Sequence, residues 1–319
     1  MKVLVFGKDG QLGKAFQKAF SSRQDSNEIQ VEFLGRAECD LSNPGAITTA
    51  LKAANPNLII NASAYTAVDK AEAEADLAFA INTRAPELMA AYAAKHGATF
   101  VHYSTDYVFD GEKYGFYLED DQRNPLGVYG KSKAAGEEAI ARIFANSNNG
   151  QYAILRTSWV YGDGGNFIRT ILRLAKDREE LKVIADQYGV PTSAQWLARV
   201  SLELALTPVG GLQTFPSGIY HAVPAGETTW HGLACLSVQA ALDAGVVLRA
   251  KPEAIKPIPA TEYPLPAPRP TNSKMATDKL QSVLRISRTY NDSIQNSQFP
   301  HWEEMVQDYV RKLASSGVI

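Results

Sequence analysis

The stretch Lys2-Val3-Leu4-Val5-Phe6-Gly7-Lys8-Asp9-Gly10-Gln11-Leu12-Gly13 decides the fold. Its apolar start predicts a short buried strand, and the glycines that follow are spaced GxxGxxG, directly before a helical pattern. Gly7 and Gly10 would let the backbone turn sharply next to a pyrophosphate at the N-terminus of the helix, and Gly13 would let the helix pack closely on the strand. The stretch therefore predicts a dinucleotide-binding β-α unit rather than a merely tight turn.

Short β-branched or aromatic runs alternate with helical patterns through the first two-thirds of the chain. The runs expected to be strands are Val3–Phe6, Val31–Leu34, Leu58–Asn61, Thr99–Tyr103 and Ala153–Thr157. Between two of them, a helix is expected over Arg84–Lys95, because Pro86 lies in its first turn and Gly97 follows its end. This alternation predicts an α/β fold, a Rossmann-type doubly wound parallel sheet followed by a smaller C-terminal α/β substrate domain.

Composition narrows the function classes. The 319 residues carry 32 basic and 34 acidic side chains, a formal net charge of −2, so the whole molecule does not attract nucleic acid. The two cysteines, Cys39 and Cys235, form neither a CxxC pair nor a disulfide framework. No signal peptide is recognisable and no run of about 18 apolar residues occurs. We therefore expect a cytoplasmic protein with neither a nucleic-acid nor a membrane partner.

The end of the second expected strand bears on the choice of cofactor. A fold that prefers NAD places a carboxylate there for the ribose 2′-hydroxyl, whereas this chain reads Leu34-Gly35-Arg36. A guanidinium suits a 2′-phosphate, so Arg36 favours NADPH, with NADH as the alternative and a solvated loop residue as the plain interpretation. We expect Asp40 and Leu41 to flank the adenine, and the segment after the third strand, Asn61–Ala64, to pass beneath the cofactor.

Tyr129 and Lys133 stand at positions i and i+4 of a helix expected to begin near Pro125, so they project from one face. A nearby ammonium favours the phenolate, which brings a poor acid-base group closer to a useful range. Thr105, at the exit of the fourth strand, could hydrogen-bond a carbonyl oxygen, and Asp106 could accept from a sugar hydroxyl. Taken alone, Thr105 and Asp106 could equally be a capping cluster.

Several segments together resemble the extended short-chain dehydrogenase/reductase superfamily and, within it, the dTDP-4-dehydrorhamnose reductase family. The matching segments are Gly7–Gly13, Asn61–Glu72, His102–Phe109, Tyr129–Lys133, Arg156–Tyr161, Asp186–Thr192 and Arg269–Ser273. The glycine loop and the Tyr/Lys pair are common to the superfamily, whereas the TAVDKAE, STDYVF and DQYGVPT segments are more diagnostic of the reductases.

This resemblance implies NADPH-dependent reduction of the C4 ketone of dTDP-4-dehydro-L-rhamnose to dTDP-L-rhamnose, the last step in making this sugar donor. It implies that Tyr129 protonates the C4 alkoxide, that Lys133 tunes Tyr129 and binds ribose, and that Thr105 steadies the carbonyl. The cofactor contacts expected are Gly7, Gly10, Gln11, Leu12, Gly13, Arg36, Asp40, Leu41, Ala62, Ser63, Ala64, Tyr65, Tyr103, Tyr129 and Lys133. The substrate contacts implied are Thr66, Val68, Thr105, Asp106, Trp159 and Asn166.

The chain departs from the family at one feature. Some members dimerise around Mg²⁺ held by glutamates, but the corresponding positions here are Ala15 and Gln195, with only Glu303 or Glu304 left as a third ligand. A methyl group and an amide do not supply the charged oxygen site that Mg²⁺ prefers. No bound metal is expected, and a homodimer, if one forms, is expected to lack a bridging metal.

Two rivals to the reductase stay open. One is a nucleotide-sugar epimerase or dehydratase of the same fold, and the other is a non-catalytic NADP-binding regulatory subunit. The five histidines, His102 among them, lack metal-ligand spacing and are expected to be packing or surface residues.

The chain is expected to divide into an NADP-binding domain, 1–165, and a smaller nucleotide-sugar-binding domain, 166–319. Parts of 195–223 are expected to rejoin the first sheet, with Leu197–Leu206 and Ile219–Val223 as candidate strands. The proline-rich stretch Pro252–Pro270 is expected to be neither helix nor central strand. A short helix is expected near Thr277–Leu284, and a closing helix over Trp302–Leu313.

Overall fold

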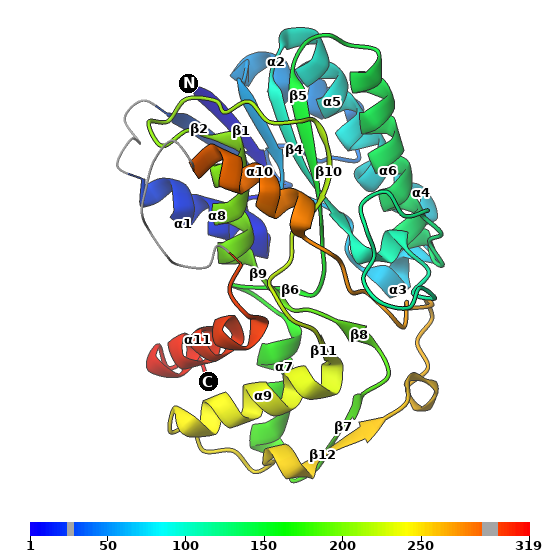
Figure 1. The fold of residues 1–319 in the computed structure, drawn as a ribbon, viewed down its shortest axis with the longest axis vertical. Helices are drawn as coiled ribbons and strands as arrows, with labels where there is room; N and C mark the ends of the chain where they lie inside the picture. The colour runs from blue at the N-terminus through cyan, green and yellow to red at the C-terminus, as the bar shows by residue number, and fades with distance from the viewer. Residues whose placement is uncertain (24–28, 289–298) are drawn as a thin grey trace.

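A computed structural model describes residues 1–23, 29–288 and 299–319, which form two lobes along the long axis of the molecule (Figure 1). The larger lobe is built on a six-stranded sheet with the order β10-β5-β4-β3-β1-β2. Every neighbouring pair in it is parallel. The strands are β1 (Lys2–Phe6), β2 (Gln30–Leu34), β3 (Leu58–Asn61), β4 (Thr99–Thr105), β5 (Gln151–Thr157) and β10 (Gly218–His221). The expected α/β class and doubly wound parallel sheet are confirmed.

Helices cover both faces of the sheet because successive strand residues point to opposite faces and both faces are apolar. In β1, Val3 and Val5 pack under one helical layer, and Leu4 and Phe6 pack under the other. The first layer contains α1 (Gln11–Ser21), α8 (Ala194–Ala205) and α10 (Asp278–Arg288). The second contains α2 (Pro44–Ala54), α5 (Ala85–His96) and α6 (Val128–Ala145).

Helix ends follow the local sequence. Asn43 caps α2 by accepting from the backbone N–H groups of Gly45 and Ala46, and Pro44 occupies its first position. The helix expected over Arg84–Lys95 is α5, which ends at Gly97 in the left-handed region with φ of 71°. Between β3 and α5 the chain forms α3 (Val68–Ala71), α4 (Ala75–Phe79) and a π-helical turn, Ala80–Arg84.

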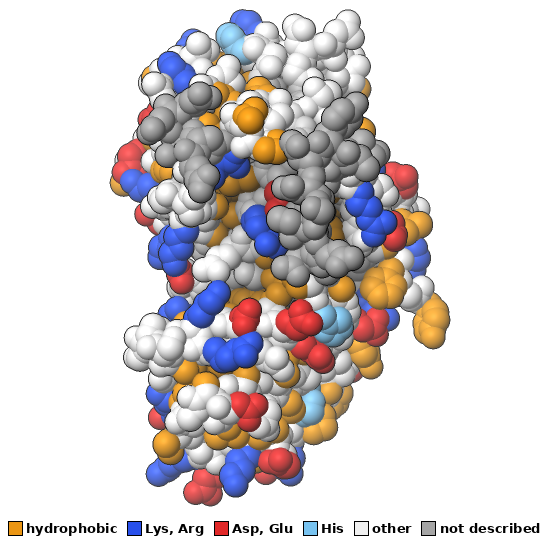
Figure 2. Space-filling view, turned by 60° about the vertical axis from the view of Figure 1, so that its left-hand side comes forward, with side chains coloured by type: hydrophobic (Ala, Val, Ile, Leu, Met, Phe, Trp, Pro, Cys, Tyr) orange, Lys and Arg blue, Asp and Glu red, His pale blue; other side chains and the backbone are white. Residues whose placement is uncertain are grey.

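The smaller lobe has its own apolar core between α7 (Phe167–Asp177), α9 (Trp230–Asp243) and α11 (Trp302–Ser315). Short strand pairs complete it: parallel β7 (Leu181–Ile184) with β12 (Ile255–Ile258), antiparallel β8 (Tyr188–Gly189) with β11 (Thr228–Thr229), and parallel β6 (Val160–Tyr161) with β9 (Thr192–Ser193). On the face shown in Figure 2, acidic and basic side chains are intermixed over this lobe.

Two late segments were expected to be strands, and only one is. The segment Ile219–Val223 contributes to β10, which pairs with β5. The prediction for Leu197–Leu206 was wrong, because all of this segment but its last residue, Leu206, lies in α8. Its leucines recur with helical spacing, and Ser193 caps the helix by accepting from the N–H of Trp196. The boundary between residues 165 and 166 stays a prediction.

The last two expected helices, near Thr277–Leu284 and over Trp302–Leu313, are α10 and α11. Within residues 1–23, 29–288 and 299–319, no helix combines the length and apolar character needed to cross a bilayer.

Candidate active site

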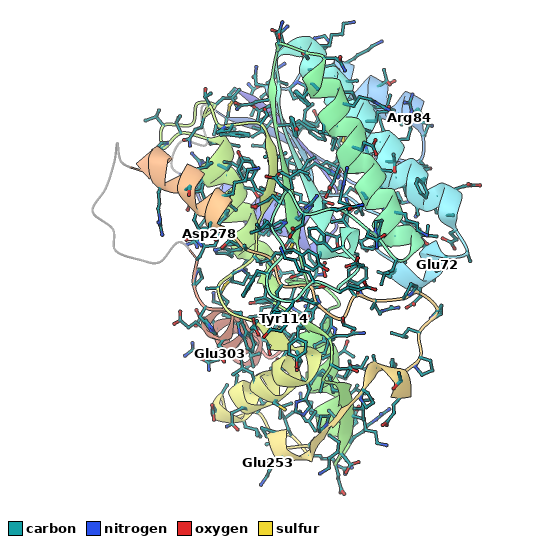
Figure 3. All side chains as sticks on the ribbon, turned by 45° about the vertical axis from the view of Figure 1, so that its right-hand side comes forward. Glu72, Arg84, Tyr114, Glu253, Asp278 and Glu303 are labelled. Atoms are coloured by element: carbon teal, nitrogen blue, oxygen red, sulfur yellow. The ribbon has the colours of Figure 1, made fainter. Side chains whose placement is uncertain are left out.

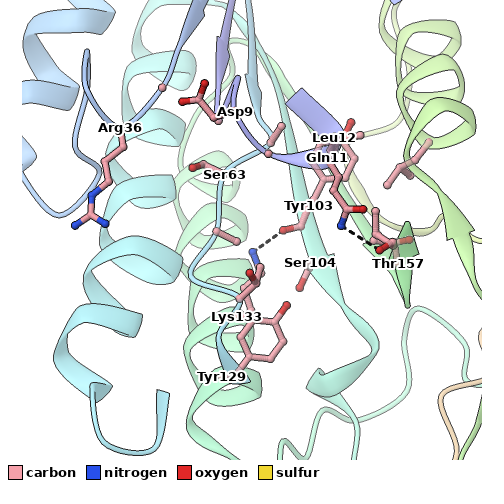
Figure 4. Close-up of a pocket in the computed structure, with 18 residues that line it drawn as sticks. Asp9, Gln11, Leu12, Arg36, Ser63, Tyr103, Ser104, Tyr129, Lys133 and Thr157 are labelled. Carbon is pink, nitrogen blue, oxygen red and sulfur yellow. Dashed lines mark hydrogen bonds between the residues drawn. The ribbon is translucent and has the colours of Figure 1, made fainter. Parts of the chain in front are cut away.

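A cavity of about 400 Å³ lies at the C-terminal ends of β1, β3, β4 and β5, where the strand order changes direction (Figure 4). A second cavity of about 260 Å³ shares Gly7, Arg36 and Ser63 with the first and extends past the end of β2. Together the two cavities form one crevice, and the glycine loop borders it mainly along the first cavity. An open α/β sheet binds nucleotides at this place.

Two positions of the glycine loop admit no side chain, because the neighbouring backbone packs closely against them. Gly7 has φ of +91°, and a Cβ atom there would lie 2.9 Å from the backbone of Ala62. A Cβ atom on Gly13 would lie 2.0 Å from the Gly7 carbonyl oxygen. Helix α1 begins at Gln11 with neither a side-chain cap nor an acidic residue in its first turn, so its positive end is free for an anion. These residues fit a dinucleotide pyrophosphate.

A guanidinium with few contacts lies where the two cavities meet. Arg36 lines both cavities, and its side chain is 82% exposed, with its Nε 4.0 Å from an oxygen of Asp40. The nearby Glu38 is already paired, since its Oε1 accepts from Lys8 Nζ at 2.6 Å and its Oε2 accepts from the Gly35 N–H at 2.8 Å. These contacts hold the pKa of the Glu38 carboxyl below its usual range. The arrangement fits a 2′-phosphate better than a 2′-hydroxyl.

Tyr129 and Lys133 lie near the start of α6 and point into the crevice (Figure 4). The start of α6 is held by Glu72, whose Oε1 accepts from the Val128 N–H at 2.8 Å; Glu72 is labelled in Figure 3. Lys133 is 1% exposed, and its Nζ donates to the Tyr103 carbonyl oxygen at 2.5 Å. Residues four apart in one rigid helix therefore present the phenol and the ammonium to the same space.

Burial shifts the pKa of both proton-transfer groups, in opposite directions. It raises the pKa of Tyr129 to about 12, an effect that Thr105 opposes. It lowers the pKa of Lys133 to about 8, against the charge of Glu137 one turn further along α6. Tyr129 is therefore a neutral acid throughout the physiological range, while Lys133 titrates close to neutrality.

Thr105 and Asp106 lie just beyond the crevice wall, at the end of β4. The Thr105 hydroxyl donates to Asp106 Oδ1 at 2.9 Å and accepts from the Tyr107 N–H at 3.2 Å, so the pair does cap the strand exit. Burial raises the pKa of Asp106 to about 6. The Ser273 side chain interacts with this carboxyl and opposes the shift, while Asp106 Oδ2 makes no close hydrogen bond to the described residues. A buried oxygen without a close partner is a candidate acceptor for a ligand hydroxyl.

Of the other substrate contacts implied by the resemblance, Thr66 lines both cavities, whereas Val68, Trp159 and Asn166 are not among their lining residues. Val68 begins α3. Trp159 has a left-handed φ of 46° and stacks on Trp230, with ring centroids 3.8 Å apart. Such backbone strain in a non-glycine residue is typical of functional sites.

The side chain of Asn166 is fully engaged within the protein. Its Oδ1 accepts from the Arg169 N–H as the cap of α7, and its Nδ2 donates to Tyr309 Oη at 2.9 Å and to the Gly162 carbonyl oxygen at 3.0 Å. This amide therefore fixes the loop that leads into the smaller lobe. Its expected contact with nucleotide phosphate stays a prediction.

All the expected cofactor contacts except Gly13 line one of the two cavities. Gly13 packs behind Gly7 instead. The sequence did not single out several other lining residues, namely Asp9, Gly35, Ser104, Thr157, Val160 and Leu197. Ser104 Oγ and Thr157 Oγ1 are buried without partners among the described residues. Both residues lie at the ends of adjacent parallel strands, and this position could have identified them as lining residues from the sequence.

In the described part of the chain, no three His, Cys, Asp or Glu side chains come together in a way that could hold a metal ion. Ala15 is buried in α1, and Gln195 is exposed on α8. Whether the protein functions without a metal stays a prediction.

Comparison with known proteins decides the family. A family model described as the RmlD substrate binding domain matches residues 1–314. The dTDP-4-dehydrorhamnose reductase of Shigella flexneri is 42% identical over 321 residues, in an alignment that covers 100% of both chains. The chain belongs to the dTDP-4-dehydrorhamnose reductase family.

Solved dTDP-4-dehydrorhamnose reductases have the same fold. The enzyme from Clostridium acetobutylicum is 34% identical with a TM-score of 0.83, and the alignment covers 98% of this chain and 99% of that one. The enzyme from Bacillus anthracis, solved in complex with NADP, is 30% identical with a TM-score of 0.80 and the same coverage. The resemblance to the dTDP-4-dehydrorhamnose reductase family is thereby confirmed.

Proposed function

We propose that the protein reduces the C4 ketone of dTDP-4-dehydro-L-rhamnose to dTDP-L-rhamnose, with NADPH as the reductant. The observation that carries this proposal is the convergence of Tyr129 and Lys133 on the crevice that the glycine loop borders. A neutral phenol beside an ammonium suits the protonation of an alkoxide as it forms. The names of the full-length relatives supply the substrate.

NADPH, when bound, supplies a hydride. Tyr129 donates its phenolic proton to the C4 oxygen, and the Lys133 ammonium stabilises the phenolate that remains. To orient the carbonyl oxygen, the Thr105 hydroxyl would donate to it in place of Asp106 Oδ1. A catalytic acid must lie within hydrogen-bond reach of the oxygen that it protonates, and the fixed start of α6 places the phenol accordingly.

The cofactor would extend along the whole crevice. The residues proposed to hold it are Gly7, Gly10, Gln11, Leu12, Gly13, Arg36, Asp40, Leu41, Ala62, Ser63, Ala64, Tyr65, Tyr103, Tyr129 and Lys133. The residues proposed to contact the substrate are Thr66, Val68, Thr105, Asp106, Trp159 and Asn166. The proposal includes a cytoplasmic location, where NADPH is made, and allows a homodimer without a bridging metal.

Incubation of the purified protein with NADPH and the 4-keto sugar tests this function. We expect one NADPH to be oxidised for each dTDP-L-rhamnose formed. Turnover without net cofactor consumption would favour an epimerase or dehydratase. Tight NADP binding without turnover of any nucleotide sugar would favour a regulatory subunit.

Arg36 is proposed to bind the 2′-phosphate of NADPH. Replacement of Arg36 by Ala should raise the KM for NADPH roughly tenfold, the effect of one charge-assisted hydrogen bond at an exposed site, and leave the KM for NADH unchanged. Initial-rate measurements with both cofactors check this. Arg142→Ala, at an exposed arginine on the far part of α6, is the matched control and should change neither value. An equal effect of Arg36→Ala on both cofactors would contradict the assignment.

Because Ala15 and Gln195 cannot hold a divalent cation, activity should be independent of metal. Dialysis against EDTA should change kcat by less than about twofold and leave the elution volume in gel filtration unchanged. Inactivation by EDTA that added Mg²⁺ reverses would show that other residues bind the ion.

A further inference from the structure

A buried histidine contacts the proton-transfer pair. His102 lies in β4 and is 0% exposed, with its Nε2 3.2 Å from Lys133 Nζ. Its Nδ1 lies 3.1 Å from Nδ2 of Asn61, the last residue of β3, which is also 0% exposed. We expected His102 to be a packing or surface residue, but both of its ring nitrogens have polar partners, and one of these is Lys133.

Asn61 determines which ring nitrogen carries the hydrogen. Its Oδ1 accepts from the backbone N–H of Ser63 at 3.2 Å, so its Nδ2 donor group faces His102. Nδ1 of His102 must then accept, and in a neutral imidazole the hydrogen is on Nε2. An Nε2–H group that faces Lys133 Nζ needs a lone pair there, and only the neutral amine has one.

The ammonium form of Lys133 requires the opposite arrangement. An ammonium has three donors and no acceptor, so Nε2 of His102 must accept and Nδ1 must carry the hydrogen. The Asn61 amide must then rotate to present Oδ1 to Nδ1, which leaves the Ser63 N–H without this acceptor. Ser63 lines the crevice, so the rotation changes the hydrogen-bonding capacity of the crevice wall.

We propose that His102 is a positioning residue for proton transfer, with a neutral imidazole that changes tautomer with the charge on Lys133 and holds Nζ in place in both states. This proposal depends on the proposed function in one respect only, namely that Lys133 takes part in proton transfer.

The surrounding charges agree with a neutral imidazole. Burial, and secondarily the Lys133 charge, hold the pKa of His102 well below its ordinary value. Glu137 raises the pKa of Lys133 but is itself paired with Arg156 from β5. Tyr129, the remaining titratable neighbour on α6, has its pKa raised to about 12 and stays protonated. Lys133 is therefore the group that changes charge near pH 8.

The tautomer can be read directly by nitrogen NMR of the full chain with ¹⁵N-labelled histidine and without cofactor. The His102 signals are assigned by their absence from the His102→Gln variant. We expect hydrogen on Nδ1 at low pH and on Nε2 at high pH, with a midpoint near the Lys133 pKa of about 8. A single tautomer from pH 6.5 to 9.5, or an imidazolium, would overturn the proposal.

Asn61→Asp provides the second test, because a carboxylate accepts from both the Nδ1–H of His102 and the Ser63 N–H. The variant should keep the Nδ1–H tautomer over the whole range and favour charged Lys133. Reductase activity needs the ammonium and falls as pH rises through the Lys133 pKa, so this decline in kcat should move up by about one pH unit. An unmoved decline with the tautomer fixed would refute the coupling. An inactive wild type would refute the proposed function and leave the tautomer result unaffected.

Discussion

Replacement of Tyr129 by Phe should lower kcat by roughly 10²–10⁴-fold, the range that general acid catalysis contributes. Phenylalanine keeps the ring and its edge contact with Tyr107, whose centroid lies 5.7 Å away, but it has no proton to donate. The dissociation constant for NADPH should change less than threefold, because the glycine loop and Arg36 are untouched. Steady-state kinetics with the 4-keto sugar and a fluorescence titration with NADPH measure the two effects.

Tyr114→Phe is the matched control, since Tyr114 is fully exposed and lines neither cavity (Figure 3). It should retain wild-type kinetics. If Tyr129→Phe kept more than about a tenth of wild-type kcat, another group would have to be the acid. Asp106 would be examined first, because burial raises its pKa to about 6.

Replacement of Arg156 by Met should destabilise the protein by about 3–5 kcal/mol, because it leaves the Glu137 carboxylate buried and largely uncompensated. Arg156 and Glu137 are 1% and 0% exposed, and two hydrogen bonds of 2.8 and 2.7 Å join them. Arg123 also reaches Glu137, at 3.4 Å, and supplies only part of the lost pairing. Urea denaturation followed by circular dichroism measures the free energy of unfolding.

Two control variants distinguish the destabilisation caused by the unpaired buried charge from that caused by the loss of the arginine side chain. The double variant Glu137→Met/Arg156→Met should recover most of the stability, since an apolar pair often replaces a buried ion pair at little cost. Arg142→Met, which removes an exposed pair with Glu87, should cost less than about 1 kcal/mol. A single Arg156→Met variant as stable as wild type would show that Glu137 is protonated or hydrated in the fold.

The cofactor half of the crevice was predictable because it is local in sequence. A strand, a glycine loop and a helix follow one another within residues 2–21, and backbone sterics at Gly7 and Gly13 dictate their packing. Tyr129 and Lys133 were predictable for the same reason, since helical geometry alone places residues four apart on one face.

Contacts between distant elements could not be derived from local patterns. Lys133 and His102 are 31 residues apart and meet only because α6 packs on β4. Trp159 and Trp230 stack across the smaller lobe, and nothing near either residue indicates the other. The segment 197–206 was mistaken for a strand because a short apolar run fits both a buried strand and a buried helix.

Reduction with NADPH that carries deuterium at the transferable C4 position tests most directly whether the enzyme transfers hydride from the cofactor to the C4 ketone. In ordinary water, the product dTDP-L-rhamnose should carry one deuterium on sugar C4, and mass spectrometry with proton NMR would locate it. Product without deuterium at C4, or with deuterium at another carbon, would contradict direct transfer to the C4 ketone.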